Sequence, residues 1–320
     1  MKKAILIGFG NVGRTLAEEL IKLDMVEIIG VITTKGFFKN NSNWKSWLKE
    51  LIKSYPNYKH EESLLEDVLK ELDIDIAFVT IPPSYYNGEP NLTIYNKLLS
   101  NRINIITADK TGLSLNYENL INEANKNRLF FGYRATVMAG TPATDVAKGL
   151  KGRNIKEIKA VLNATTNYIL SLIEKGYTFE KALEEVKRLG LVEPDPKIDI
   201  EGFDAAAKIV IILNTLGIKS TINDVKRESL LSIDEKDIRN AIEKGRKIKY
   251  IASYNKNKTK VGLEEVDYES PLAKVSGNYN CISFVIDEDN IITLTGPAGP
   301  ALNTARAMIT DLYEFHEKNY

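Results

Sequence analysis

The stretch KKAILIGFGNVGRTLAEELIKL, residues 2–23, predicts how the first half of the chain folds. A short apolar strand, residues 4–7, leads into three glycines in G-x-G-x-x-G spacing, and leucines then recur at helical period. In such a unit the first glycine permits the tight turn, the second lets backbone approach a pyrophosphate, and the third allows close helix packing. We therefore expect a dinucleotide site, the alternative being an ordinary glycine-rich turn. Its expected binding residues are Gly8, Gly10, Asn11, Val12 and Gly13.

The strand VEIIGVITT, residues 26–34, bears on the choice of coenzyme. A site that prefers NAD usually has Asp or Glu about twenty residues after the glycines, where it binds the ribose 2′-hydroxyl. Here Thr33, Thr34 and Lys35 stand at that place, so an acid is missing and a cation is present. This pattern favours NADP, or tolerance of both coenzymes. The alternative is that Lys35 is a solvated loop lysine.

Three further apolar strands complete the expected first domain. DIDIAFVTIPP passes through Thr80, INIITADK ends at Lys110, and RLFFGYRATV follows, with helical patterns between them. Strands alternating with helices predict a parallel, doubly wound α/β sheet of Rossmann type. Because ligands bind beyond the carboxyl ends of such strands, Thr80 and Lys110 join the expected cofactor site. Residues 36–60 are expected to form an irregular insertion with one amphipathic helix, which packs on the domain or covers the adenosine end of the cofactor.

The residue counts exclude several classes of protein. Lys plus Arg and Asp plus Glu both number 43, so the net charge is zero and no nucleic-acid or membrane-surface partner is indicated. The single cysteine, Cys281, excludes an internal disulfide, and His60 and His316 do not suggest a zinc site. With neither histidine placed for acid–base work, proton transfer falls to lysine or a carboxylate. No membrane span or signal-peptide cleavage site is recognisable, so we expect a cytoplasmic protein.

Past Gly140 the pattern changes, and a second, α+β domain is expected. A helix from Thr141 precedes a strand–helix pair, IKEIKAVLNATTNYILSLIEKG, whose helix has Thr165 or Thr166 as its expected N-cap. The amphipathic helix TFEKALEEVKRLGL is expected to end at Gly190. Three β-rich segments and a C-terminal helix follow. We therefore expect a dinucleotide-binding domain over residues 1–140 and a substrate-binding, catalytic domain over residues 141–299.

The segment VEPDPKIDIEGFDAAAK, residues 192–208, gathers acids around a lysine. Its two prolines forbid regular helix, so we expect Glu193, Asp195 and Asp199 on a rigid loop. The very apolar helix that follows Gly202 carries Asp204 and Lys208 one turn apart, hence on one face. A lysine on a buried helix must be paired or line a cavity, and a neighbouring carboxylate can tune it for proton transfer. The alternative is a buried ion pair with a purely structural role.

Seven motifs in order resemble those of the homoserine dehydrogenases, in the short form without a regulatory ACT domain. They are GFGNVGR, TADK, ATVMAGTP, LNATTNYIL, LGLVEPDPKIDIEGFDAAAK, PLAKVSGNYNCI and TGPAGPALNTA. The resemblance covers nearly the whole chain. It implies an oxidoreductase that interconverts L-homoserine and L-aspartate 4-semialdehyde by hydride transfer with NADP or NAD, in threonine and methionine biosynthesis.

The resemblance also implies roles for particular residues. Lys208 would donate and accept the proton at the substrate oxygen, and Asp204 would orient it. Glu193 and Asp199 would bind substrate, with Glu193 at its ammonium group, and Lys110 would lie between nicotinamide and substrate. In the family the C-terminal helix, here residues 300–320, returns to the nucleotide domain, and the central domain forms a homodimer through its sheet.

The family also holds a monovalent cation, sodium or potassium, largely by backbone carbonyls. The matching positions are Arg134, Val137, Ala139 and Thr141. The family commonly has Glu where Arg134 stands, and a cation beside a cation site is unfavourable, which weighs against the ion here. Other departures from the family pattern are Asp109 for Asn, Ala164 for Gly and the Ala298-Gly299-Pro300 loop.

Two alternatives remain open. The first is another NAD(P)-dependent dehydrogenase of similar build. An aldehyde-oxidising one needs a nucleophilic cysteine, and Cys281 lies in a strand-like segment without a nearby histidine. The second is a non-catalytic, dinucleotide-sensing protein, which would not need the acid–lysine group.

Overall fold

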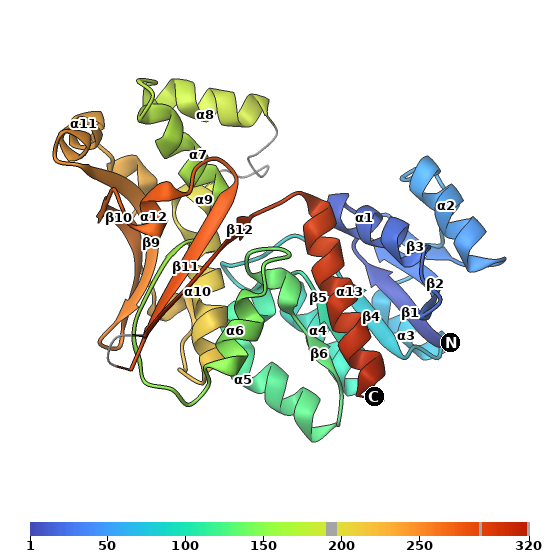
Figure 1. Cartoon of the computed structure of the whole chain (residues 1–320). Helices are drawn as coiled ribbons and strands as arrows, with labels where there is room; N and C mark the ends of the chain where they lie inside the picture. Colours follow the sequence, from blue (N-terminus) through green and yellow to red (C-terminus); the bar gives the residue numbers. More distant parts are fainter. Residues whose placement is uncertain (190–196, 288–289, 319–320) are drawn as a thin grey trace. The chain divides into compact units, whose positions relative to one another are not determined.

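The structure is a computed structural model, and it describes residues 1–189, 197–287 and 290–318. The chain divides into two compact units (Figure 1). Unit 1 comprises Met1–Gly140 and Pro300–Tyr320, and unit 2 comprises Thr141–Gly299. Each unit contains its own six-stranded sheet.

Unit 1 is built on a sheet in the order β3-β2-β1-β4-β5-β6. The strands are β1 (Lys2–Ile7), β2 (Val26–Thr33), β3 (Gly36–Lys39), β4 (Ile76–Val79), β5 (Asn104–Thr107) and β6 (Phe131–Gly132). All neighbouring strands run parallel except β2 and β3, which are antiparallel. The predicted doubly wound sheet is thus confirmed, in the strand order typical of dinucleotide-binding folds.

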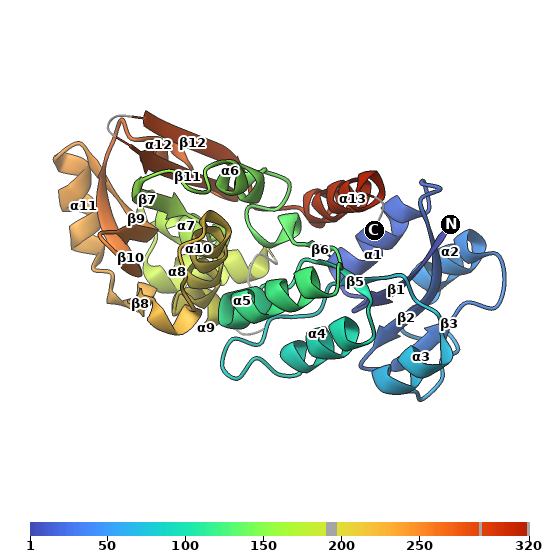
Figure 2. The ribbon, with the colours of Figure 1, turned by 90° about the horizontal axis from the view of Figure 1, so that it is seen from below.

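Helices cover both faces of this sheet (Figure 2). One face carries α1 (Asn11–Leu20), α2 (Trp44–Ser54) and α13 (Ala301–Glu317), and the other carries α3 (Leu65–Glu71), α4 (Asn91–Ser100) and α5 (Thr111–Lys126). Side chains alternate between the two faces along each strand, so Leu6 packs in the α1–α13 core and Ile5 in the opposite core. Trp44 and Trp47 are buried in the first core, which confirms that α2 packs on its own unit.

The sequence prediction that residues 36–60 are irregular apart from one helix was wrong at Gly36–Lys39, which form the strand β3. Phe37 and Phe38 are both buried, but they enter opposite cores of unit 1. Only a strand places consecutive side chains on opposite faces of a sheet, and here it adds an antiparallel edge to β2. A strand this short carries too little periodicity to be recognised from sequence.

Unit 2 has a sheet in the order β12-β11-β7-β9-β10-β8. The strands are β7 (Ile155–Val161), β8 (Lys226–Arg227), β9 (Arg246–Asn255), β10 (Lys258–Asp267), β11 (Tyr279–Ile286) and β12 (Asn290–Pro297). Neighbours are antiparallel except β8 and β10. The helices are α6 (Ala143–Gly149), α7 (Ala164–Ile173), α8 (Phe179–Arg188), α9 (Lys197–Ile200), α10 (Phe203–Leu216), α11 (Glu235–Glu243) and α12 (Pro271–Lys274). This arrangement confirms the expected α+β character.

The helix α10 is the centre of unit 2. It packs against α6, β9 and β10, and most of its side chains are buried, as the apolar sequence predicts. Gly202 precedes it with a φ of +75°, and a Cβ atom there would lie 2.6 Å from the hydroxyl oxygen of Tyr250. Glycine is therefore required at the turn from α9 into α10.

Two local predictions in unit 2 were wrong. The helix α7 begins at Ala164, so its N-cap is Asn163 and not Thr165 or Thr166. The Asn163 side chain accepts a hydrogen bond from the Thr166 N–H at 2.9 Å, which an asparagine does as well as a threonine. Asp199 lies in the single helical turn α9 and not on a loop, because no proline follows residue 196 in this stretch to prevent helix. The predicted helix end at Gly190 lies outside the described residues.

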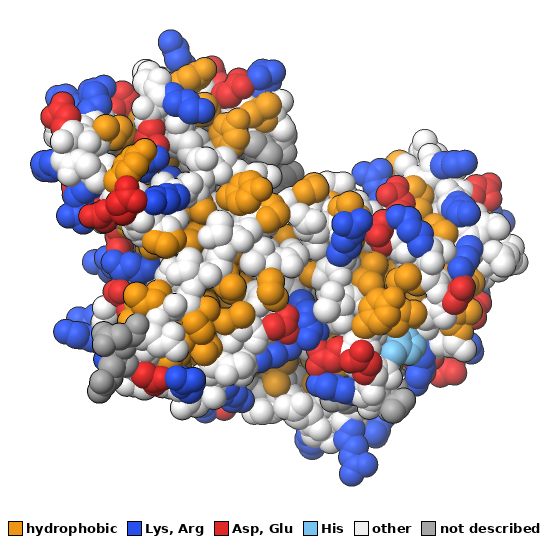
Figure 3. All heavy atoms as spheres, in the orientation of Figure 1, with side chains coloured by type: hydrophobic (Ala, Val, Ile, Leu, Met, Phe, Trp, Pro, Cys, Tyr) orange, Lys and Arg blue, Asp and Glu red, His pale blue; other side chains and the backbone are white. Residues whose placement is uncertain are grey.

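Surface features agree with the residue counts. On the face shown in Figure 3, acidic and basic side chains are interspersed over each unit, consistent with a net charge of zero. Across residues 1–189, 197–287 and 290–318, no helix combines the length and apolar character needed to cross a membrane.

Candidate active site

The turn between β1 and α1 is shaped by three glycines. Gly8 has a φ of +93°, and a Cβ atom there would lie 2.7 Å from the carbonyl oxygen of Thr80. A Cβ at Gly13 would lie 2.6 Å from the carbonyl oxygen of Gly8, so α1 packs this closely only with glycine. Gly10 borders open space instead, because a Cβ there would meet no atom within 4 Å. The turn is thus tight on the protein side and accessible beside Gly10.

Thr80 supports this turn from the neighbouring strand. It directly follows β4, and its hydroxyl donates a hydrogen bond to the carbonyl oxygen of Gly8 at 3.0 Å. Its N–H donates to the carbonyl oxygen of Ile7 at 2.8 Å. The helix α1 begins with Asn11 and Val12, and the first turn of a helix has N–H groups that lack an intrahelical acceptor. The predicted residues therefore lie together at a helix N-terminus suited to a pyrophosphate.

Lys35 lies in the turn between β2 and β3, and it is exposed. Its N–H donates to the hydroxyl of Thr33 at 3.0 Å. The turn follows the carboxyl end of β2, which neighbours β1, so Lys35 lies at the same edge of the sheet as the glycine turn. A cation at this edge suits the 2′-phosphate of NADP.

Lys110 is the N-cap residue of α5 and is partly buried. The residue before it, Asp109, is buried and accepts hydrogen bonds from the N–H of Thr111 at 3.0 Å and the hydroxyl of Thr111 at 2.8 Å. Its other oxygen accepts from the hydroxyl of Tyr95 at 3.0 Å. Burial raises the pKa of Asp109 above its ordinary value, and the hydrogen bonds from Thr111 oppose that rise. These bonds fix the backbone on both sides of Lys110.

In unit 2, Asp204 and Lys208 form the pair that their spacing predicted. The Lys208 ammonium donates to the Asp204 carboxylate at 2.7 Å and to the carbonyl oxygen of Leu162 at 2.7 Å. The side chains of Lys208 and Asp204 are only 13% and 14% exposed, so water screens their attraction little. The helix α10 positions both groups, and Leu162, which directly follows β7, supplies the second acceptor.

Asn163 joins Asp199 to this pair. Its amide nitrogen donates to Asp199 at 2.6 Å and to Asp204 at 3.0 Å. Burial and the nearby Asp204 carboxylate raise the pKa of Asp199 to about 6, while hydrogen bonds from Asn163 and Thr165 oppose that rise. The structure thus brings two carboxylates, a lysine and an amide together in unit 2.

Several of these residues were missed when the sequence was read for chemistry. Asn163 and Thr165 lie in the LNATTNYIL motif, and Asn280 lies in PLAKVSGNYNCI. Asn280 is fully buried and donates to the carbonyl oxygen of Leu162 at 3.3 Å, the same oxygen that accepts from Lys208. The only sequence signal for them is membership of these motifs. Glu193 and Asp195 lie outside the described residues.

The expected cation positions can be tested against one observation. The Arg134 guanidinium donates to Asp311 of α13 at 2.7 Å and also contacts Glu314. Its charge is therefore neutralised within unit 1, and the repulsion expected between Arg134 and a bound cation is weakened. Val137 and Ala139 follow Arg134 in the chain, and Ala139 has a positive φ of 48°. Within the described part of the chain no group of three or more His, Cys, Asp and Glu side chains could hold a metal ion.

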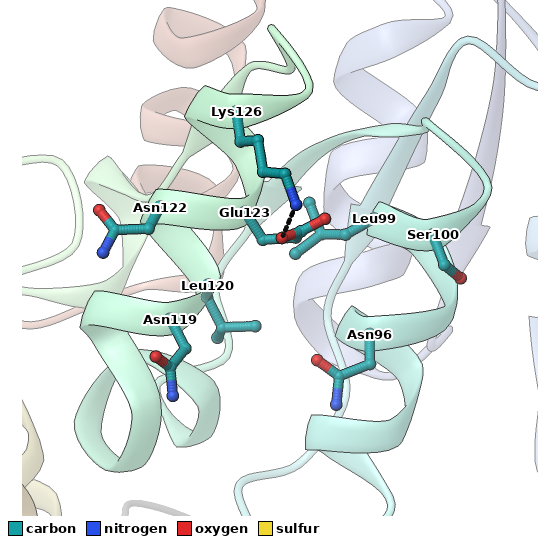
Figure 4. A pocket seen from close by; sticks show the side chains of 8 residues that line it. All are labelled: Asn96, Leu99, Ser100, Asn119, Leu120, Asn122, Glu123 and Lys126. Carbon is teal, nitrogen blue, oxygen red and sulfur yellow. Dashed lines mark ion pairs between the residues drawn. The ribbon is translucent and has the colours of Figure 1, made fainter.

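A groove of about 520 Å³ lies between α4 and α5 (Figure 4). The side chains that line it are Asn96, Leu99, Ser100, Asn119, Leu120, Asn122, Glu123 and Lys126. Glu123 and Lys126 form an ion pair at 3.9 Å. The groove contains none of the predicted cofactor or substrate residues that the structure describes, so we assign it no catalytic role.

Comparison with known proteins decides the family. The family model described as homoserine dehydrogenase matches residues 143–313. A homoserine dehydrogenase from Sulfurisphaera tokodaii is 33% identical over 97% of both chains. The chain belongs to the homoserine dehydrogenase family. The homoserine dehydrogenase of Methanocaldococcus jannaschii is 34% identical over 98% of both chains.

Further relatives agree with this assignment. An NAD(+)-dependent homoserine dehydrogenase from Pseudomonas canavaninivorans is 28% identical over 98% of this chain and 96% of its own. The solved structure of a hyperthermophilic archaeal homoserine dehydrogenase in complex with NADPH has a TM-score of 0.83 and 26% identity, covering 99% of this chain and 98% of its own. The resemblance inferred from the motifs is therefore confirmed, and with it the expected class of enzyme, an NAD(P)-dependent oxidoreductase.

Proposed function

We propose that the chain reduces L-aspartate 4-semialdehyde to L-homoserine reversibly, with Lys208 as proton donor and acceptor. The reaction consumes one proton and one hydride per aldehyde and yields the alcohol. The observation that carries the proposal is the Lys208 ammonium, held between Asp204 and the carbonyl oxygen of Leu162 on a buried helix. With homoserine as its product, the enzyme would act in threonine and methionine biosynthesis.

The geometry at Lys208 supports a proton-transfer role. A protonated lysine has three N–H bonds, and Asp204 and Leu162 accept two of them. A neutral lysine keeps two N–H bonds for the same acceptors, and its lone pair takes the third position. A proton can therefore pass between that third position and the substrate oxygen while both supporting hydrogen bonds are retained. Asp204 holds the ammonium charge that forms on proton uptake.

The amino-acid end of the substrate is assigned to carboxylates. We propose that Glu193 and Asp199 bind it, with Glu193 at the ammonium group. Asp199 is nine-tenths buried or more, and at pH 7 it is ionised in most molecules because its pKa is about 6. A buried carboxylate of this kind is a strong partner for a cationic group.

The cofactor is proposed to bind at the glycine turn of unit 1. Gly8, Gly10 and Gly13 shape the turn, and Thr80 supports it. Asn11 and Val12 would supply N–H groups to the pyrophosphate, Lys35 would meet a 2′-phosphate, and Lys110 would lie beside the nicotinamide. Bound NADPH or NADH supplies the hydride, and the oxidised coenzyme accepts it in the reverse direction.

The remaining assignments concern assembly and ions. We propose that unit 1 is the dinucleotide-binding domain, with α13 as its C-terminal element, and that unit 2 is the substrate-binding, catalytic and dimerisation domain. The active form is proposed to be a cytoplasmic homodimer. The residues proposed to hold a sodium or potassium ion are Val137, Ala139 and Thr141, through their backbone carbonyls.

The rival aldehyde-oxidising chemistry is disfavoured by Cys281. Its side chain is fully buried in β11, and burial raises the pKa of its thiol. A nucleophilic cysteine needs the opposite, an accessible thiol with a lowered pKa. Acyl-enzyme chemistry at Cys281 therefore lacks support.

The test is homoserine-dependent reduction of NADP and of NAD, followed in parallel by absorbance of the reduced nicotinamide. Turnover with homoserine supports the reaction, and the ratio of kcat/KM for the two coenzymes tests the assignment of Lys35. Protein that binds a coenzyme but shows no turnover with homoserine contradicts the proposal.

A further inference from the structure

We propose that Asn163 is a positioning residue of the reaction, whose amide holds Asp199 and Asp204 together so that Asp199 stays ionised for substrate. The proposal rests on the proposed function, because it assumes that Asp199 binds substrate. It assigns Asn163 a role beyond the helix cap.

The contacts of Asn163 require an amide. Both N–H bonds of its side chain are directed to carboxylates, to Asp199 at 2.6 Å and to Asp204 at 3.0 Å. Its oxygen accepts from the N–H of Thr166 at 2.9 Å. Ionised carboxylates only accept and a backbone N–H only donates, so these neighbours fix the orientation of the amide. Asn163 is 4% exposed, so water cannot readily replace these bonds.

The electrostatics show why the two carboxylates need this donor. Asp199 and Asp204 are like charges that share one amide, and the Asp204 carboxylate destabilises the ionised form of Asp199. Among the described residues, the charged groups that act on Asp199 are Asp204, which raises its pKa, and Lys208, which lowers it; both lie on α10. The hydrogen bond from Asn163 also lowers the pKa of Asp199. Loss of this bond moves the pKa of Asp199 above about 6, and fewer molecules hold it ionised near neutral pH.

Two substitutions separate this role from the helix cap. Asn163→Ser keeps an oxygen that can cap α7, but its single hydroxyl cannot donate to both carboxylates as the two amide N–H groups do. Asn163→Asp keeps the size of the side chain and the capping oxygen, and replaces the donor by a third acid. The control is Thr178→Ala. This substitution removes the hydroxyl that caps α8, where it accepts from the Lys181 N–H at 3.3 Å.

The measurement is the pH profile of kcat/KM for NADPH-dependent reduction of aspartate 4-semialdehyde between pH 5 and 8. This profile reports groups of the free enzyme. We expect its acid limb to move upward by about one pH unit in Asn163→Ser, and further in Asn163→Asp, because loss of a charge-assisted hydrogen bond is worth about one pKa unit. The value of kcat/KM at pH 5 then falls about tenfold, while kcat/KM at pH 8 changes less than about twofold. Thr178→Ala should keep the wild-type limb.

A second readout does not depend on turnover. The carboxyl ¹³C resonance of Asp199, identified with Asp199→Asn, is titrated in wild type and both Asn163 variants. Movement of this titration to higher pH supports the proposal, even if wild type fails to act on homoserine and the proposed function fails. An unchanged Asp199 titration in both folded variants overturns it, and so does an unchanged acid limb in an active enzyme. If one variant fails to fold, the other carries the same test.

Discussion

Replacing Asp199 by asparagine should make the folded protein more stable at neutral pH while impairing catalysis. The ordinary pKa of an aspartate is 3.8, and burial together with Asp204 raises that of Asp199 to about 6. Each pKa unit corresponds to about 1.4 kcal/mol, so keeping Asp199 ionised in the folded state costs about 3 kcal/mol at pH 7. Asparagine removes this cost, and its oxygen can still accept from Asn163.

The sign of the pH dependence follows from the two pKa values. Between about pH 4 and 6 the folded protein retains a proton on Asp199 that the unfolded chain has released. The free energy of unfolding contributed by this group therefore falls as pH rises through that window, and it is constant above it. Asp199→Asn should lack this fall, so the difference in the free energy of unfolding between variant and wild type should increase from pH 4 to 6.

The assay is urea denaturation at several pH values, followed by far-UV circular dichroism. Tryptophan fluorescence is unsuitable, because Trp44 and Trp47 both lie in unit 1 and Asp199 lies in unit 2. The matched control is Asp73→Asn, since the side chain of Asp73 is 94% exposed and should change stability by less than about 0.5 kcal/mol. A variant no more stable than wild type at pH 7, with an unchanged slope from pH 4 to 6, would refute the reasoning.

Three further substitutions test other parts of the molecule. Gly13→Ala places a Cβ 2.6 Å from the carbonyl oxygen of Gly8, so the Kd for NADPH should rise at least about tenfold. The Kd is measured by the fluorescence of bound coenzyme. The control is Gly149→Ala, whose Cβ meets nothing within 4 Å and which should leave this Kd unchanged. Lys35→Asp should lower the NADP-to-NAD ratio of kcat/KM by about tenfold, and an unchanged ratio contradicts the 2′-phosphate assignment. Burial lowers the pKa of Lys249 from 10.5 to about 8. The free energy of unfolding, measured by urea denaturation, should therefore rise from pH 8 to 10 in wild type but not in Lys249→Met. The same dependence on pH in both proteins would contradict this prediction.

The Asp204–Lys208 pair could be predicted because its geometry is local. Two residues four apart on one helix share a face whatever the rest of the fold does, and the apolar residues around them indicated burial. The observed 2.7 Å hydrogen bond confirms the pairing. The second acceptor, the carbonyl oxygen of Leu162, could not be predicted, because it is brought there by β7.

Asn163 shows the limit of reading a sequence for chemistry. It lies 41 residues from Asp204, and nothing in the intervening sequence indicates that they meet. A helix cap and a bridge between carboxylates use the same amide, so the residue type is explained by its local role alone. Lys249 was missed for a similar reason, because its strand was recognised but its complete burial depends on what covers the sheet.

The fold of unit 1 was largely predictable, because parallel strands buried on both faces form strong apolar runs between helices. Where prediction failed, the signals were short. Residues 36–39 form a strand of four residues, and Asp199 lies in a helix of four residues, each too brief to show a period.

The most direct test of the central claim is the turnover of Lys208→Met, with Lys187→Met on the exposed face of α8 as control. The substitution removes the ammonium between Asp204 and Leu162 and keeps a side chain of similar length. Loss of a positioned acid–base group should lower kcat for homoserine oxidation by about 10²–10⁴, with the Kd for NADPH within about twofold of wild type. A folded Lys208→Met protein with kcat within about tenfold of wild type would contradict the assignment of Lys208 as the proton donor and acceptor.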